Sequence, residues 1–225
     1  MVLRLSGFKD KEVVVSHWTG KFVIGLTGNI GTGKSVVRQM LEGMGAFGVD
    51  ADDVAHQVIR RGEAGYAPVL AAFGSSILGA NKEIERAKLA GVVFKDPQAL
   101  IRLEDIIHPL VDLKIESLIQ SAASPVVVIE AIKLIESGIS LKCDCVWVTV
   151  AHPDIQLKRL VEIRHLSEAD ARRRIAVQPP QEAKASLANL VINNNAALME
   201  TRQFVLTAWE KTVPIKPGKS QTKEI

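Results

Sequence analysis

Residues 22–35 read FVIGLTGNIGTGKS, and this stretch decides the fold of the chain. Its first six residues form a continuous, mostly apolar segment, the pattern of a strand buried on both faces of a parallel sheet. The turn that follows fits G-x-x-x-x-G-K-[ST] over residues 28–35. A helix is expected next, because apolar residues recur at helical spacing from Val37 to Met44 and Gly45 can end it. We therefore predict a strand, a turn and a helix in direct succession.

Each residue type in this turn has a chemical task. The glycines let the backbone curl so that its N–H groups converge on phosphate oxygens at the positive end of the next helix. Lys34 is expected to reach the β- and γ-phosphates, and the Ser35 hydroxyl to bind Mg²⁺. The turn alone predicts binding of a nucleoside triphosphate and does not separate a kinase from a GTPase or a motor. A guanine-reading Asn-Lys-x-Asp sequence is absent, which disfavours a GTPase.

Strand-like and helical patterns alternate along the rest of the chain, which predicts an α/β domain with a mainly parallel sheet. Four more strands are predicted, at residues 47–49, 125–130, 146–150 and 190–192. Together with the first strand they make five.

Two further segments are expected to lie over the sheet. Residues 54–121 carry helical patterns only, more than a simple crossover needs, and are interpreted as a helical insertion that could cover a substrate. Residues 165–185 are rich in Arg, Glu and Gln, follow a predicted helix at 152–164, and could form a mobile flap. A helix at 196–210 is predicted to close the domain.

The composition of the 225 residues favours an enzyme with an anionic ligand. A net charge of +3 with an isoelectric point near 8.9 is only mildly basic, and an aromatic content of 4% leaves few surfaces for stacking bases. The chain lacks the roughly 18–20 consecutive apolar residues that span a membrane, and residues 1–20 lack the apolar centre of a signal peptide. We expect neither a nucleic-acid nor a membrane partner.

The two cysteines, Cys143 and Cys145, are one residue apart. In a strand they would point to opposite faces, so neither a disulfide between them nor a zinc site is expected. Two reduced thiols are consistent with a cytoplasmic protein.

Asp50, Ala51 and Asp52 directly follow the second predicted strand. Ligands of open parallel sheets bind at the carboxyl ends of the strands, so a carboxylate here could orient an attacking hydroxyl or accept its proton. Phosphoryl transfer asks mainly for alignment and charge stabilisation, so one such base is sufficient. The alternative is that Asp50, Asp52 or Asp53 only caps the next helix, and the sequence leaves both interpretations open.

Basic residues are frequent between residues 158 and 184. Most basic runs are solvated faces, and Arg172 and Arg173 are interpreted in that way. Arg159 and Arg164 differ because they bracket the end of a helix that leads into the predicted flap. Kinases need cations that close over the phosphates and neutralise charge in the transition state, and we predict that role for Arg159 and Arg164.

In order and spacing, these features resemble the dephospho-CoA kinase family from about residue 21 to residue 205. The turn at 24–35 and the acidic stretch DADDVAH at 50–56 are similar to two motifs of that family. The other matching stretches are, in chain order, Phe73-Gly74, RAKL at 86–89 with Val93-Phe94, LEDIIHPLV at 103–111, Gln156 to Arg159 with Arg164, residues 178–184, and VINN at 191–194.

The resemblance implies a three-layer αβα P-loop kinase fold with a parallel five-stranded sheet, a helical substrate-binding insertion for the CoA moiety, and a lid over ATP. The domain organisation expected from the residues and the resemblance together is an N-terminal extension at 1–20, a kinase domain at 21–212 and a flexible tail at 213–225, with the insertion at about 54–121 and the lid at about 165–185. It also implies that Asp50 is the base and that His108 and Pro109 lie near the acceptor. From the residues alone, His108 is more typical of a structural histidine.

Three features depart from the family pattern. Residues 132–136 read IKLIE where the family usually carries PLLFE, so Lys133 brings a cation to an apolar position. Asn189 stands where Asp is usual. About 20 residues precede the first sheet strand, and they could hold an extra strand around Val13 to Val15, an oligomer contact or a misassigned start.

The resemblance leads us to expect Mg²⁺-dependent transfer of the γ-phosphoryl group of ATP to the ribose 3′-hydroxyl of dephospho-CoA, giving CoA and ADP. This is the last step of coenzyme A biosynthesis. A monomer or weak homo-oligomer is expected. Two alternatives stay open: a kinase of another small alcohol or nucleotide on the same core, and a catalytically silent ATP-binding module. The predicted site residues are Asp50, Lys34, Arg159 and Arg164 for catalysis, Gly28, Asn29, Ile30, Gly31, Thr32, Gly33, Lys34, Ser35 and Val36 for ATP, Ser35 for the metal, and Asp52, Arg86, His108 and Pro109 for the acceptor.

Overall fold

The computed structural model describes residues 17–214. The strand suggested around Val13 to Val15 lies outside the described residues, as does all of the predicted tail beyond Pro214.

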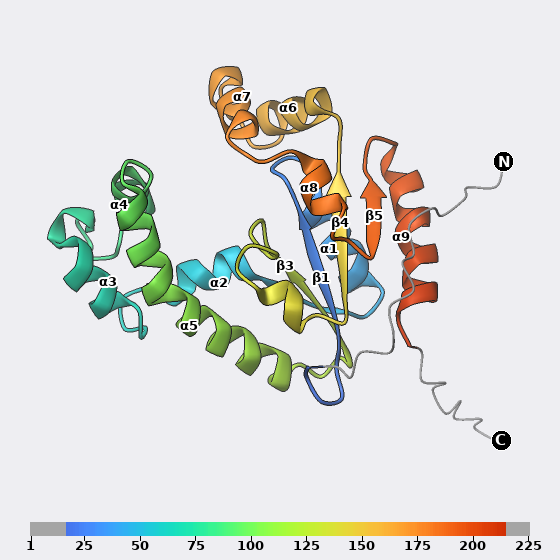
Figure 1. The fold of residues 1–225 in the computed structure, drawn as a ribbon, viewed down its shortest axis with the longest axis horizontal. Helices are drawn as coiled ribbons and strands as arrows, with labels where there is room; N and C mark the ends of the chain where they lie inside the picture. Colours follow the sequence, from blue (N-terminus) through green and yellow to red (C-terminus); the bar gives the residue numbers. More distant parts are fainter. Residues whose placement is uncertain (1–16, 215–225) are drawn as a thin grey trace.

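The centre of the molecule is a five-stranded sheet in the order β2-β3-β1-β4-β5, and every neighbouring pair of strands is parallel (Figure 1). The strands are β1 (Phe22–Gly28), β2 (Phe47–Asp50), β3 (Val126–Glu130), β4 (Cys145–Val150) and β5 (Leu190–Asn193). This confirms the predicted α/β class and parallel five-stranded sheet, with strand ends within one or two residues of the prediction. All strands point the same way, so their carboxyl ends meet along one edge.

Helices cover both faces of the sheet because the strands are apolar on both sides. Along β1, Val23 packs in a cluster with helices α2 (Ala51–Gln57) and α5 (Pro97–Ser121). The next residue, Ile24, packs in a second cluster with α1 (Lys34–Gly43) and α9 (Leu198–Thr212) on the other face. The result is the expected three-layer αβα arrangement.

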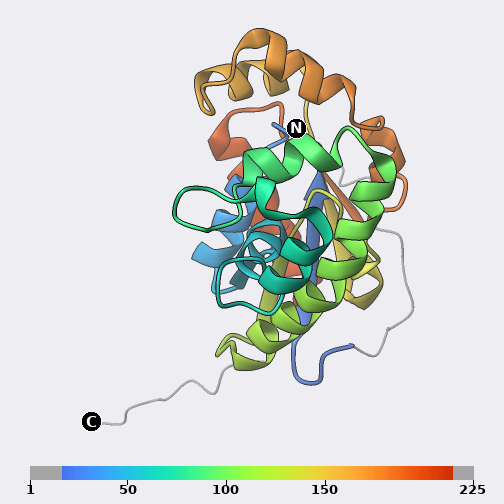
Figure 2. The same ribbon diagram turned by 90° about the vertical axis from the view of Figure 1, so that its left-hand side faces the viewer.

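Most of the chain between β2 and β3 is helical, as predicted. After α2 come α3 (Tyr66–Phe73), the 3₁₀ turn η1 (Ser75–Ile77), α4 (Arg86–Val93) and then α5, the longest helix at 25 residues. In Figure 1 these elements extend from one side of the sheet, and in Figure 2 the same side faces the viewer, so that they lie in front of the sheet. The helix α5 carries Pro109 in its interior, where proline removes one helical hydrogen bond.

A second helical group lies above the carboxyl ends of the strands (Figure 1). It consists of α6 (Pro153–Glu162), α7 (Glu168–Ala176) and α8 (Gln181–Ala185). The predicted flap at 165–185 therefore contains two short helices. Leu160 of α6 and Ala171 of α7 are fully buried against Ile30, so this group packs directly on the glycine-rich turn.

The two cysteines lie in different elements. Both thiols are free, and Cys145 is the first residue of β4, one residue before the start of the predicted strand. Cys143, however, lies before the strand, at the end of the 3₁₀ turn η2 (Ile139–Lys142), because the chain is still turning into the sheet there. Burial raises the pKa of the Cys143 thiol to about 12, so this thiol is protonated at neutral pH.

Within residues 17–214 the helices are too short or too polar to cross a lipid bilayer.

Candidate active site

The glycine-rich turn between β1 and α1 has the backbone shape that only glycine allows. Gly28 and Gly33 have φ angles of 149° and 91°. A Cβ atom on Gly28 would lie 2.4 Å from the carbonyl oxygen of Thr149, and one on Gly33 would lie 2.0 Å from Nδ2 of Asn194. Any side chain at these positions would push the turn away from the ends of β4 and β5.

Polar side chains from distant parts of the chain hold the turn in place. The Thr32 hydroxyl donates to the Asn29 carbonyl at 2.8 Å and lies 2.7 Å from the Thr149 hydroxyl. Asn194 Nδ2 donates to the Thr32 carbonyl at 2.8 Å, and Gln156 Nε2 donates to the Ile30 carbonyl at 2.9 Å. The turn is therefore preorganised by its surroundings. Gln156 and Asn194 belong to stretches that resemble the family, but their contacts with the turn were not predicted, and neither was that of Thr149, because each reaches the turn only through the topology of the sheet.

Lys34 begins α1 and is only 7% exposed. Burial lowers the pKa of its ammonium group to about 8, while the nearby carboxylates of Glu130 and Asp52 act in the opposite direction. Its Nζ atom donates to the Asn29 carbonyl at 3.3 Å. A partly desolvated cation of this kind interacts more strongly with a bound anion than a cation in water does.

Glu130 is a site residue that the sequence analysis missed. It ends β3, is 4% exposed, and accepts a 2.8 Å hydrogen bond from the Ser35 hydroxyl through Oε1. Its other oxygen, Oε2, accepts from Nε of Arg38 at 2.9 Å. The signal that could have revealed it is its place at the carboxyl end of a buried strand, the same signal that drew attention to Asp50.

A pocket of about 340 Å³ opens beside the turn. Part of its wall is polar, from the turn and from neighbouring cations, and part is apolar, from α1, α6 and the start of α9. Its lining residues are Gly31, Gly33, Lys34, Ser35, Val36, Arg159, Leu160, Ile163, Arg164, Asn194, Ala196 and Leu198. Five of the nine residues predicted to bind ATP thus line the pocket, whereas Asn29 and Thr32 are buried in the turn and stabilise it.

Arg159 and Arg164 both lie at this pocket, as their predicted role requires. Arg159 donates to the carbonyl of Asn194 at 2.8 Å and to that of Gly31 at 3.3 Å, so its guanidinium is held against the turn. Burial lowers the pKa of Arg159. Arg164 is exposed, and its positive charge contributes to the lowered pKa of Lys34.

The acidic turn lies next to the same edge of the sheet. Asp50 is paired in register with Glu130 at the ends of β2 and β3. Its Oδ1 caps α2 by accepting the backbone N–H of Asp53 at 3.0 Å, so Asp50 does make the capping contact. Only one carboxylate oxygen is used in the cap; Oδ2 has no hydrogen bond to residues 17–214, which leaves it available for a ligand.

Asp52, two residues further on in the same turn, accepts a hydrogen bond from the backbone N–H of Ile132 through Oδ2 at 3.4 Å. Burial raises the pKa of the Asp52 carboxyl; the Ile132 hydrogen bond opposes this, and the negative charge of Asp50 adds to it. Asp52 is also close enough to Lys34 for the two charges to influence each other.

The remaining predicted substrate residues lie farther along the helical side of the molecule. Arg86 begins α4 and lines a separate open depression of about 270 Å³ together with Asp53, His56, Ile59, Arg60, Glu83 and Ile84. Burial lowers the pKa of His56, and the charge of Arg86 lowers it further. His108 and Pro109 lie exposed on α5. The exposure of His108 argues against a buried structural role for this histidine.

Two departures from the family pattern have a structural explanation. Lys133 forms an ion pair of 2.6 Å with Glu104 of α5, so within the described residues its partner is a carboxylate of the protein. Asn189 accepts the backbone N–H of Val146 through Oδ1 at 2.8 Å. An aspartate could accept the same hydrogen bond, so asparagine preserves this contact.

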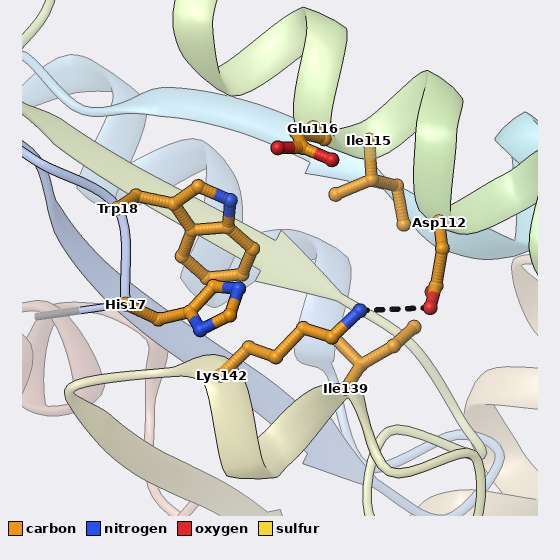
Figure 3. A pocket seen from close by; sticks show the side chains of 7 residues that line it. All are labelled: His17, Trp18, Asp112, Ile115, Glu116, Ile139 and Lys142. Atoms are coloured by element: carbon orange, nitrogen blue, oxygen red, sulfur yellow. Dashed lines mark hydrogen bonds and ion pairs between the residues drawn. The ribbon is translucent and has the colours of Figure 1, made fainter.

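A further pocket lies at the opposite, amino-terminal edge of the strands. It is small and is lined by His17, Trp18, Asp112, Ile115, Glu116, Ile139 and Lys142 (Figure 3). Lys142 is paired with Asp112 at 2.8 Å, so its charge is already matched. Trp18 is buried in the core cluster of α5, which shows that the chain packs against the domain before β1 begins. The glycine-rich turn and the acidic residues are not part of this pocket.

Comparison with known proteins agrees with the geometry at the carboxyl edge. The family model described as dephospho-CoA kinase matches residues 22–200. Among curated proteins, the dephospho-CoA kinase of Streptomyces avermitilis is 40% identical over 201 residues, which cover 88% of this chain and 98% of the relative. That of Geobacillus kaustophilus is 42% identical over 187 residues, which cover 81% of this chain and 92% of the relative.

Solved structures show the same likeness. A protein of Thermus thermophilus superposes with a TM-score of 0.76 and 26% identity, covering 86% of this chain and 99% of its own. The dephospho-CoA kinase of Campylobacter jejuni gives a TM-score of 0.61 and 25% identity, covering 84% and 96%. With the family model spanning the whole sheet and close relatives matched over nearly their full length, the chain belongs to the dephospho-CoA kinase family.

Proposed function

We propose that this protein transfers the γ-phosphoryl group of ATP to the ribose 3′-hydroxyl of dephospho-CoA, giving CoA and ADP in the cytoplasm. The observation that carries the proposal is the placement of the buried Lys34 beside a preorganised phosphate-binding turn, with the acidic turn of Asp50 and Asp52 at the same edge. Family membership supplies the acceptor. The two free cysteines support the cytoplasmic location.

In the proposed reaction the triphosphate lies against the backbone N–H groups of residues 31–35, and the adenosine enters the apolar part of the pocket of about 340 Å³. Asp50 accepts the proton of the 3′-hydroxyl as the hydroxyl oxygen bonds to the γ-phosphorus. The bond from that phosphorus to the β,γ-bridging oxygen breaks, and ADP leaves. Lys34, Arg159 and Arg164 stabilise the charge that is transferred.

The residues beside the turn fit a Mg²⁺ ion. Ser35 supplies a hydroxyl and Glu130 a carboxylate, both oxygen donors of the kind that Mg²⁺ prefers, and they already contact each other at 2.8 Å. When bound, the ion would neutralise charge on the phosphate oxygens. Arg38 holds the far oxygen of Glu130 and so fixes the direction in which the carboxylate points.

A coupled assay of ADP release tests the proposal. With the purified protein, Mg²⁺ and ATP, ADP should form at a rate that depends on added dephospho-CoA, and mass spectrometry should detect CoA in equal amount. If ADP formation depended on another alcohol or nucleotide and not on dephospho-CoA, that compound would be the acceptor. ATP binding without any transfer would identify a silent ATP-binding module.

The role of Glu130 leads to a prediction about Mg²⁺. In Glu130→Gln the carboxylate charge is lost, and the Mg²⁺ concentration that gives half the maximal rate should rise about tenfold or more. The rate should be titrated with Mg²⁺ at saturating ATP and dephospho-CoA. Glu42→Gln is the matched control, because Glu42 also binds Arg38 but does not contact Ser35. An unchanged Mg²⁺ requirement in Glu130→Gln would remove Glu130 from the metal site.

The pKa of Lys34 predicts a pH dependence of ATP binding. Its value of about 8 means that Lys34 is mostly charged at pH 7 and mostly neutral at pH 9. Because the charged form attracts the triphosphate, ATP should bind about tenfold more weakly at about pH 9 than at about pH 7. At about pH 9 the binding of ATP should be accompanied by uptake of a proton by Lys34.

Calorimetry at several pH values, in two buffers of different ionisation enthalpy, measures both the affinity and the proton. Lys34→Arg is the control, since arginine keeps its charge over this range and its affinity should change much less with pH. Equal pH dependence in the two proteins would assign the effect to another group.

A further inference from the structure

Lys184 of α8 is a buried cation that the proposed reaction does not use. The residue is 4% exposed, although α8 is a short helix that lies beside the carboxyl ends of β1 and β4 (Figure 1). A lysine is rarely buried to this extent unless its ammonium group is paired. Here its Nζ atom donates to the backbone carbonyl of Ile132 and forms an ion pair of 2.9 Å with Glu136.

Both partners belong to the turn of residues 131–136, which follows β3 and which we call the 131–136 turn. Its residue Ile132 makes contacts on two sides. Its carbonyl accepts from Lys184 and, at 3.1 Å, from the hydroxyl of Thr27 in β1. Its N–H points toward the Asp52 carboxylate at 3.4 Å. Lys184 therefore contacts the same residue that meets Asp52.

The charge of Lys184 also influences two groups of the site. It favours the ionised form of the Asp52 carboxyl, and it contributes to the lowered pKa of Lys34. Glu136 matches part of this charge. Burial works against ionisation of Glu136, but the hydrogen bond and charge of Lys184 hold the pKa of its carboxyl below the usual value.

A second lysine connects the 131–136 turn to the helical side of the molecule. Lys133 is paired with Glu104 of α5 at 2.6 Å. The turn is thus held by α8 on one side and by α5 on the other. The chain just before α8 also contacts the phosphate-binding turn, because the side chain of Gln178 accepts the backbone N–H of Ile30 at 2.7 Å.

From these contacts we propose that Lys184 is a positioning residue for the acceptor: it holds the 131–136 turn so that Asp52 and the backbone of Ile132 keep their places beside the acceptor. This inference rests on the proposed function. It assigns Lys184 a role through the turn, without contact to the reacting atoms. Loss of Lys184 should therefore weaken binding of the acceptor far more than binding of ATP.

The test compares Lys184→Met with Lys184→Arg and with wild type. Methionine keeps the length of the buried side chain and removes the charge and the donor. We expect the KM for dephospho-CoA to rise about tenfold in Lys184→Met, the loss that follows when a buried charged hydrogen bond is broken. The KM for ATP should stay within about twofold, because the contacts of the phosphate-binding turn are intact. Lys184→Arg should recover much of the loss, since arginine can still donate to Ile132 and pair with Glu136.

Lys142→Met is the matched control. It removes another lysine of a lysine–carboxylate pair, with Asp112, in the pocket at the opposite edge of the sheet (Figure 3), and should leave both KM values unchanged. Glu136→Gln is measured in the same way and should raise the KM for dephospho-CoA by a smaller factor. Glu136 is half-exposed, so this variant keeps the test valid if Lys184→Met does not fold.

The outcomes separate this inference from the proposed function. A wild-type protein that does not phosphorylate dephospho-CoA would contradict the proposed function itself. An active wild type whose Lys184→Met and Glu136→Gln variants keep the KM for dephospho-CoA within about twofold would overturn the positioning role, as would an equal rise in both KM values.

Discussion

Replacing Lys34 with alanine is expected to lower kcat about 100-fold or more, the loss that follows removal of one preorganised charge at a phosphate site. The ammonium group is buried at the first residue of α1 and has a pKa lowered to about 8, so its charge is poorly hydrated before ATP binds. Two of the cations near it already have other partners: Arg159 is bound to backbone carbonyls, and Lys184 is bound to Ile132 and Glu136.

The measurement is steady-state ADP release at saturating ATP and dephospho-CoA. Lys158→Ala is a suitable control, because Lys158 is an exposed lysine of α6, the helix that also carries Arg159. Thermal unfolding of both variants checks the fold, and we expect little loss in Lys34→Ala, since a buried charge costs desolvation energy in the folded state. Near-normal turnover of Lys34→Ala would contradict the assigned role.

Replacing Asp50 with asparagine is expected to leave ATP binding intact and to lower phosphoryl transfer about 10³-fold. Asparagine keeps an oxygen that can accept the N–H of Asp53, and it is as good a helix cap as aspartate, so α2 should remain in place. What the substitution removes is the negative charge and the ability to accept a proton. The variant therefore separates the two interpretations of Asp50, which the sequence alone left open.

Asp96→Asn provides a matched control. Asp96 caps α5 in the same manner, by accepting the N–H of Gln98 at 2.9 Å. If capping were the whole role of Asp50, both substitutions would have equally small effects on the rate. Binding of ATP is measured by calorimetry and transfer by ADP release. Full activity of Asp50→Asn would move the role of base to another group, with Asp52 as the first candidate because it is the other carboxylate of the same turn that lies near Lys34.

Much of the fold could be predicted because the informative patterns are local. The strands around Val23, Val128 and Val148 are continuous apolar segments, as burial on both faces requires, and each was found to within one or two residues. The order of the strands was not predicted. The position of β3 between β2 and β1 depends on how the long helical stretch packs, and this is not encoded in any one segment.

The site divides in the same way. The phosphate-binding turn is a contiguous motif, so its residues were found from the sequence, and the structure places Lys34 and Ser35 at the pocket. Glu130 and Asn194 were missed as site residues, because they approach the turn only after strands from different parts of the chain lie side by side. Lys184 was missed because it reaches the site only through its contacts with the 131–136 turn. For Glu130, its position at the carboxyl end of a buried strand was a signal that the sequence contained.

The central claim is that the turn at residues 28–35 holds the triphosphate while the carboxylate of Asp50 aims the acceptor hydroxyl at its outer phosphorus. A crystal structure with a non-hydrolysable ATP analogue, Mg²⁺ and dephospho-CoA tests it most directly. We predict phosphate oxygens within hydrogen-bond distance of the N–H groups of residues 31–35 and the 3′-hydroxyl within hydrogen-bond distance of Asp50. Phosphates bound elsewhere, or a 3′-hydroxyl out of reach of Asp50, would contradict the account.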